Sequence, residues 1–217
     1  LYIESDIPEN NVADAVRFKE EYESLNNQDA SDDQKYRTLD IAVDNPFVYS
    51  SAEEIIKKMD EKETFVVYFG FSSCPWCRSI LEPLIESSKN HQVSKIYYVD
   101  VLEIRDTYKL DDNHQPKKVV EGSEGYNELL KRLDSVLSDY MPLTKEVEVN
   151  EKRIYAPNIV AVKDGTPIDL ISGISELQTS AYMEITSEMK EDMIKQISAL
   201  FGLLDGKAVC SEENQNC

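Results

Sequence analysis

Two cysteines that stand two residues apart, between a strand pattern and a helix pattern, constrain this chain more than any other feature. Residues 64–71 are rich in β-branched and aromatic side chains, which is typical of a buried strand. Apolar residues then recur at helical spacing from Ile80 onward. Cys74 and Cys77 therefore fall where a strand gives way to a helix, and two thiols at this spacing can close a small, reducible disulfide.

The position of Cys74 predicts that it is the nucleophile of the pair. The first turn of a helix carries unpaired N–H groups and the positive end of the helix dipole, and both stabilise a thiolate. Pro75 fits this turn because its missing N–H costs no hydrogen bond there. Cys77 lies one turn further on, where its thiol is more enclosed. In thiol-disulfide exchange, Cys74 would attack and Cys77 would resolve the mixed disulfide.

Two other uses of the pair stay open from the residues alone. Together with Cys210 and Cys217, the pair could bind zinc, although zinc knuckles usually place CxxC in a polar turn rather than at a strand-to-helix junction. A purely structural disulfide across two residues would close a tiny loop and gain little loop-closure entropy. Redox chemistry is therefore the favoured interpretation, and it requires neither a metal nor an organic cofactor.

The strand, the Cys-Pro-Trp-Cys junction and the following helix resemble thioredoxin-like proteins. Residues 154–168 are similar to that superfamily's strand with a cis-proline at its start, followed by a hairpin turn at Asp164-Gly165. The resemblance implies that Pro157 is cis and packs beside the active-site disulfide, while the Ala156 backbone pairs with a bound substrate chain. Trp76 would contact partners. The alternative for Pro157 is an ordinary trans proline on an edge strand.

The order of the patterns predicts an α/β thioredoxin-like fold, a central mixed sheet flanked by helices. We expect helices at 52–62, from the cysteines to about 90, and at 187–204, with strands at 64–71, 95–101, and around Ile159 and Ile168. A helical insertion at about 102–153 would precede the cis-proline strand. Its amphipathic part, 126–140, should pack on the sheet, and the polar loop before it could shape a substrate surface near the cysteines.

Three parts are predicted along the chain: an acidic, partly helical N-terminal arm (1–50), the thioredoxin-like domain (51–206) and a polar tail with a cysteine pair (207–217). The first 33 residues hold ten acidic and two basic side chains. Such a stretch is a solvated arm or a partly exposed helix, and disorder of the first 30 residues is the alternative. A short extended segment at 43–48 would follow.

The chain departs from the superfamily at a buried position in the strand before the motif. Thioredoxins proper carry a buried acid in the strand before the motif, and the corresponding position here is Tyr68. The central Pro75-Trp76 pair more nearly resembles glutaredoxins and extracytoplasmic disulfide exchange proteins.

Charge and cysteine usage bear on partners and location. A net charge of −19 argues against nucleic acid and against electrostatic adhesion to anionic lipid. The chain begins with Leu, so we expect that a secretory signal or lipid anchor has been removed. Outside the membrane Cys210 and Cys217 would close a small terminal loop, and exchange of this pair with Cys74 is the alternative.

The acidic leading stretch, the motif and the terminal cysteines together resemble thioredoxin-like lipoproteins of Gram-positive bacteria, some grouped with bacteriocin transport accessory proteins. This resemblance implies a thiol-disulfide oxidoreductase outside the cytoplasmic membrane, anchored or secreted, whose partners are protein thiols or disulfides and a separate redox partner. The alternative is a non-catalytic accessory module that keeps the fold and serves an exporter or a folding partner.

Overall fold

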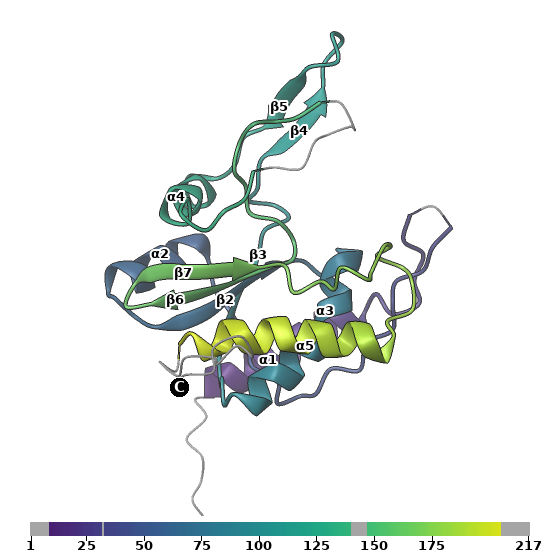
Figure 1. Cartoon of the computed structure of the whole chain (residues 1–217), viewed down its shortest axis with the longest axis vertical. Coiled ribbons are helices and arrows are strands. Elements are labelled where there is room, and N and C mark those ends of the chain that lie inside the picture. The colour runs from purple at the N-terminus through teal and green to yellow at the C-terminus, as the bar shows by residue number, and fades with distance from the viewer. Residues whose placement is uncertain (1–8, 32, 140–146, 205–217) are drawn as a thin grey trace, which may run out of the picture.

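The structure is a computed structural model and describes residues 9–31, 33–139 and 147–204. Its centre is a five-stranded sheet with the strand order β1-β3-β2-β6-β7 (Figure 1). The strands are β1 (Phe47–Tyr49), β2 (Phe65–Gly70), β3 (Ile96–Asp100), β6 (Asn158–Lys163) and β7 (Thr166–Ile171). β1, β3 and β2 run parallel, whereas β6 is antiparallel to β2 and β7 to β6. The sheet is therefore mixed, as predicted.

Helices cover both faces of the sheet. These are α1 (Glu9–Glu23), α3 (Pro75–Asn90) and α5 (Ser187–Gly202) on one face, and α2 (Ala52–Asp60) and α4 (Glu124–Arg132) on the other (Figure 1). Side chains alternate along β2, so Val66 and Tyr68 join the core with the first set, while Val67 and Phe69 join the core with the second. This arrangement confirms the predicted α/β class, a central mixed sheet flanked by helices.

Most element boundaries agree with the sequence prediction to within two residues, because local signals end the elements. At α2 the Ser51 side chain accepts a hydrogen bond from the Glu54 backbone N–H, and the Ser51 N–H donates one to the Glu54 carboxylate. At the β6–β7 hairpin, Asp164 and Gly165 both have positive φ, 49° and 77°. A two-residue turn that matches the strand twist requires this backbone conformation.

The acidic N-terminal stretch forms a partly exposed helix over Glu9–Glu23, so the disorder alternative is wrong for that helix. Its apolar stripe, Ala15, Phe18 and Tyr22, is buried against the sheet, and the Phe18 ring stacks on Phe47 with 3.9 Å between ring centroids. The acidic side chains occupy the other faces. α1 therefore belongs to the same core as the cysteine helix, while the division of the chain at residue 50 stays a prediction.

The insertion differs from the prediction in two ways. The expected polar loop contains a β-hairpin, β4 (Thr107–Leu110) with β5 (Pro116–Val120), that extends away from the central sheet (Figure 1). The amphipathic helix ends at Arg132 instead of continuing toward 140, and Tyr140 lies outside the described residues. Strand pairing within the hairpin satisfies backbone groups that an irregular loop would leave to water.

A buried ion pair closes the base of this insertion, and its helix packs on the rest of the molecule. Arg153 and Asp106, both nearly fully buried, form an ion pair of 2.6 Å at the base of the hairpin. Tyr126 and Leu129 of α4 pack into the core shared by α2 and the sheet, as expected for the insertion helix. The predicted tail at 207–217, with Cys210 and Cys217, lies outside the described residues. Within the described ranges, no helix has both the length and the apolar character needed to cross a bilayer.

Candidate active site at the start of the cysteine helix

Cys74 is the N-cap of α3, three residues separate it from the end of β2, and its extended backbone (φ −81°, ψ 112°) leads the chain into the helix. Pro75 follows in the first turn, as predicted. The Cys77 N–H donates a hydrogen bond to the Cys74 Sγ at 3.2 Å, and the Trp76 N–H acts on the same sulfur. The first turn of the helix thus directs its unpaired donors at one sulfur atom.

The two sulfurs differ in their surroundings. Cys77 is fully buried, whereas Cys74 keeps 4% of its surface exposed. Both are free thiols, and the Cys74 thiol donates a hydrogen bond to the Ala156 carbonyl at 3.2 Å. Cys74 therefore lies at the rim of the interior and Cys77 lies behind it, which is the order that the sequence predicted.

The two thiols also differ in pKa. A hydrogen bond from the Cys77 thiol lowers the pKa of Cys74, and the two backbone N–H groups and the Arg105 charge add to this against the opposing effect of burial. Burial raises the pKa of Cys77 well above its ordinary value, and the neighbouring Cys74 raises it further. Cys74 is thus the thiol that ionises, and Cys77 keeps its proton.

The remaining predicted site residues gather at the same place. The Ala156–Pro157 peptide bond is cis, Pro157 is buried, and Ala156 is half-buried with its carbonyl on Cys74. Trp76 is half-buried and packs against the core beside the cysteines. Their roles toward a substrate chain stay predictions. No cluster of metal-ligating side chains occurs in the described part of the chain, and the other half of the postulated zinc site, Cys210 and Cys217, lies outside it.

Two further residues bear on this site. Tyr68, which the sequence singled out only by its place in the strand, is fully buried, and it lowers the pKa of the Cys77 thiol against the larger effect of burial. Arg105, at the base of the β4–β5 hairpin, lies over the Phe71 ring, with its guanidinium carbon 4.8 Å from the ring centroid, and its charge reaches Cys74. Arg105 is the insertion residue through which the insertion influences the site. Because it lies in an irregular segment, no local pattern marks it.

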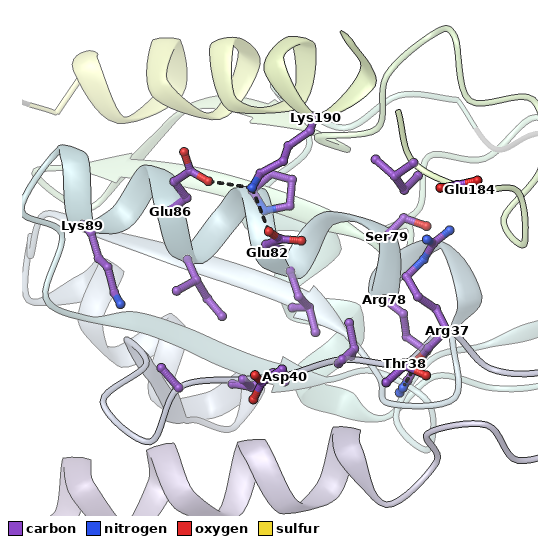
Figure 2. A pocket seen from close by; sticks show the side chains of 17 residues that line it. Arg37, Thr38, Asp40, Arg78, Ser79, Glu82, Glu86, Lys89, Glu184 and Lys190 are labelled. Carbon is purple, nitrogen blue, oxygen red and sulfur yellow. Dashed lines mark hydrogen bonds and ion pairs between the residues drawn. The ribbon is translucent and has the colours of Figure 1, made fainter. Parts of the chain in front are cut away.

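A separate hollow of about 680 Å³ lies along the outer side of α3 (Figure 2). Lys190 of α5 spans one part of it by ion pairs with Glu82 at 2.7 Å and Glu86 at 3.0 Å. Arg37 and Arg78 lie together at the other end. Neither cysteine lines this hollow, so it is not the place where a disulfide would be exchanged.

The lowered pKa of Cys74 makes a testable prediction about its reactivity. Because the thiolate is the reactive form, the alkylation rate of Cys74 should rise with pH around a midpoint below that of an ordinary cysteine. Cys77→Ala removes the strongest stabilising contact and should move this midpoint to higher pH, and Arg105→Gln should do so to a smaller extent. The measurement is the rate of iodoacetamide modification, read by mass spectrometry across a pH series.

The matched control for this experiment is Lys109→Gln, which removes a positive charge from the exposed face of the same hairpin. Its midpoint should equal that of the unmodified protein. Equal midpoints for the protein, Cys77→Ala and a model peptide would contradict the assigned electrostatics.

Comparisons with known proteins found a distant structural match. No protein-family model matches the chain, and no curated protein matches it. A solved structure that resembles it is thioredoxin O2 from Arabidopsis thaliana in the oxidised state, with 18% sequence identity and a TM-score of 0.33. The match covers 58% of this chain and 82% of that chain.

Proposed function

We propose that this chain is a thiol-disulfide oxidoreductase that acts on protein substrates outside the cytoplasmic membrane. The observation that carries the proposal is the arrangement of the two thiols. Cys74 Sγ receives hydrogen bonds from the first turn of α3. The fully buried Cys77 lies behind it, and its raised pKa keeps its thiol protonated. One thiol is thus prepared to attack and the other to resolve.

The exchange is balanced with these two residues alone. The Cys74 thiolate attacks one sulfur of a substrate disulfide, so that a mixed disulfide forms and the second substrate sulfur leaves with the electron pair. Cys77 then attacks Cys74 and loses its proton, which closes the Cys74–Cys77 disulfide and releases the first substrate sulfur as a thiolate that takes up the proton Cys77 has lost. The same steps run in reverse when the chain oxidises a dithiol.

The substrate chain would lie against Ala156, Pro157 and Trp76. The Ala156 carbonyl, which accepts the Cys74 thiol hydrogen bond in the free protein, becomes available once Cys74 is ionised or bonded to substrate sulfur. Trp76 supplies half-exposed aromatic surface beside the reacting sulfur. No organic cofactor or metal takes part in this scheme.

The proposed location outside the membrane draws on the sequence pattern shared with Gram-positive thioredoxin-like lipoproteins and on the terminal Cys210 and Cys217. It also includes a separate redox partner that returns the pair to its starting state. The location is testable in cells that make the protein. A maleimide that cannot cross membranes should label the reduced protein in intact cells, and labelling only after lysis would overturn this part of the proposal.

The accessory-module alternative has one observation in its favour. Cys74 is only 4% exposed, and a disulfide placed there could simply stabilise the fold. Access to Cys74 therefore decides between the two functions.

The deciding experiment uses insulin as a disulfide-bonded protein substrate, with dithiothreitol as the source of electrons. We expect the protein to accelerate insulin precipitation, and its Cys74 to alkylate faster at neutral pH than an exposed model thiol. The matched control is the protein with Cys74 and Cys77 both alkylated beforehand. If the untreated protein performs no better than the alkylated one while circular dichroism shows both folded, the accessory module is the correct assignment.

A further inference from the structure

Arg105 is a cation that keeps its hydrogen-bond donors free. It lies in the irregular segment between β3 and β4, its side chain is partly exposed, and its guanidinium carbon lies 4.8 Å from the centre of the Phe71 ring. In the described part of the chain, this guanidinium forms no ion pair and donates no hydrogen bond. By contrast, Lys118, Arg132 and Arg153 of the same insertion each pair with a carboxylate.

Backbone hydrogen bonds fix the segment that carries Arg105 at the end of β2. The Val101 N–H donates to the Gly70 carbonyl at 3.1 Å, and the Arg105 N–H donates to the Val101 carbonyl at 3.1 Å. From the same end of β2 the chain runs through Phe71 to Cys74, whose N–H donates to the Phe71 carbonyl at 3.1 Å. Because Arg105 packs over the Phe71 ring, it lies next to the turn that presents the reactive thiol.

The residue after Arg105 joins this segment to the other side of the site. Asp106 forms the buried ion pair with Arg153, and the Arg153 guanidinium also donates to the Asp106 carbonyl. Three residues after Arg153, the Ala156 carbonyl accepts the hydrogen bond of the Cys74 thiol. Arg105 is therefore held between the turn before α3 and the segment against which the substrate chain is proposed to lie.

A guanidinium in this setting is suited to binding a carboxylate. Its contact with the Phe71 ring restricts the side chain, so less conformational entropy is lost when a ligand binds. Its N–H donors form a planar fork that matches the two oxygens of a carboxylate. Asp100 lies within electrostatic reach of Arg105, but its carboxylate accepts a hydrogen bond from the Leu102 N–H at 2.8 Å. The fork thus remains open to a carboxylate from outside the protein.

We propose that Arg105 binds a carboxylate of the substrate chain, so that the protein favours disulfides with Asp or Glu next to one of their cysteines. This inference rests on the proposed oxidoreductase function and deepens it, because it names the class of substrate. The contact is non-covalent and leaves the exchange steps unchanged. The net charge of −19 makes the surface as a whole repel an acidic chain, so the preference depends on this local cation.

The test compares peptide disulfides that differ in one side chain. Each peptide carries one cysteine bonded to thiopyridine, with glutamate or glutamine directly before or directly after that cysteine. When Cys74 attacks the peptide sulfur, thiopyridine leaves with the electron pair, and its absorbance gives the second-order rate constant. At low salt, the glutamate peptide of at least one position should react about threefold to tenfold faster than its glutamine twin, the scale of a charge-assisted contact. Added salt should reduce this ratio.

Three variants assign the preference to one side chain. Arg105→Gln should lower the ratio to one or below, because only the repulsion from the acidic surface is left. Arg105→Lys should keep part of the ratio, because it retains the charge but not the fork. Lys109→Gln, which removes an exposed cation from the same hairpin, is the matched control and should keep the full ratio. Each ratio compares two peptides with one protein, so a change in the reactivity of Cys74 cancels.

The outcomes distinguish the two proposals. If no peptide reacts faster with the protein than with a model thiol, the oxidoreductase function itself fails. Fast reaction with equal rate constants for the glutamate and glutamine twins at both positions defeats the role of Arg105 alone. A ratio that is unchanged in Arg105→Gln also defeats it, because the preference then comes from another part of the surface.

Discussion

A Cys77→Ser variant is expected to accumulate as a covalent mixed disulfide with its protein substrates, whereas a Cys74→Ser variant forms none. The reason is the depth of the two sulfurs, since only Cys74 has any exposed surface and only its pKa is lowered. Without Cys77 the mixed disulfide has no neighbouring thiol to resolve it, so it persists until an external thiol arrives. Without Cys74 the remaining thiol is fully enclosed, and exchange should fall to the uncatalysed rate.

The measurement is non-reducing electrophoresis of acid-quenched mixtures with a reducible protein substrate, followed by mass spectrometry of the shifted bands. Ser73→Ala is the matched control, because it changes the neighbouring residue and leaves both sulfurs in place. It should behave as the unmodified protein does. Equal amounts of mixed disulfide in the two serine variants would mean that the assignment of attacking and resolving thiols is wrong.

An Arg78→Leu variant is expected to lose about 2–4 kcal/mol of unfolding free energy, because buried carbonyl groups would lose their donors. Arg78 is 1% exposed and follows Cys77 directly. Its guanidinium donates to the Tyr22 carbonyl at 2.7 Å and, through two nitrogens, to the Arg37 carbonyl at 3.1 and 2.6 Å. It also donates to the Asn26 side chain at 2.8 Å. One side chain thus joins α1 and the segment after it to the cysteine helix.

Urea denaturation with both thiols reduced measures this effect without a contribution from the disulfide. Lys89→Leu on the same helix is the matched control, since Lys89 is exposed, and its effect should stay within about 0.5 kcal/mol. Because Arg78 holds α1 against the cysteine helix, Arg78→Leu should also make the end of α1 open more often. Faster amide hydrogen exchange at Tyr22 would show this. An unchanged denaturation midpoint would mean that water replaces the guanidinium at these carbonyls.

The elements that could be predicted are those with dense local signals. β2 and α3 carry their own periodicity, and the Asp164-Gly165 turn carries the residue types that positive φ demands. The β4–β5 hairpin could not be predicted, because Pro116–Val120 shows no clean alternation and its strands pair with each other rather than with the main sheet. The sequence did not predict that α1 packs on the sheet, because its three buried side chains are interspersed with many acidic residues.

The candidate site divides in the same way. Cys74, Pro75 and Cys77 lie within one helical turn, so their relation follows from spacing alone. Ala156 and Pro157 came from a resemblance, and the structure brings their backbone onto Cys74 from 82 residues away. The Tyr22 hydroxyl meets those of Tyr68 and Tyr98 from 46 and 76 positions away, and Arg105 reaches the site from an irregular segment. A local sequence pattern does not reveal contacts between residues so far apart in the chain.

By itself the sequence determined the strand-to-helix junction, the order of its two thiols and the α/β class, because hydrogen bonds between near neighbours and the helix dipole act within one turn. Only the tertiary structure decided what surrounds the two thiols: Tyr68 over Gly70 and Tyr22 from α1 near Cys77, and Arg105 from the insertion near Cys74. Burial and electrostatic coupling depend on which distant segments share a core, and that is settled when the whole chain packs.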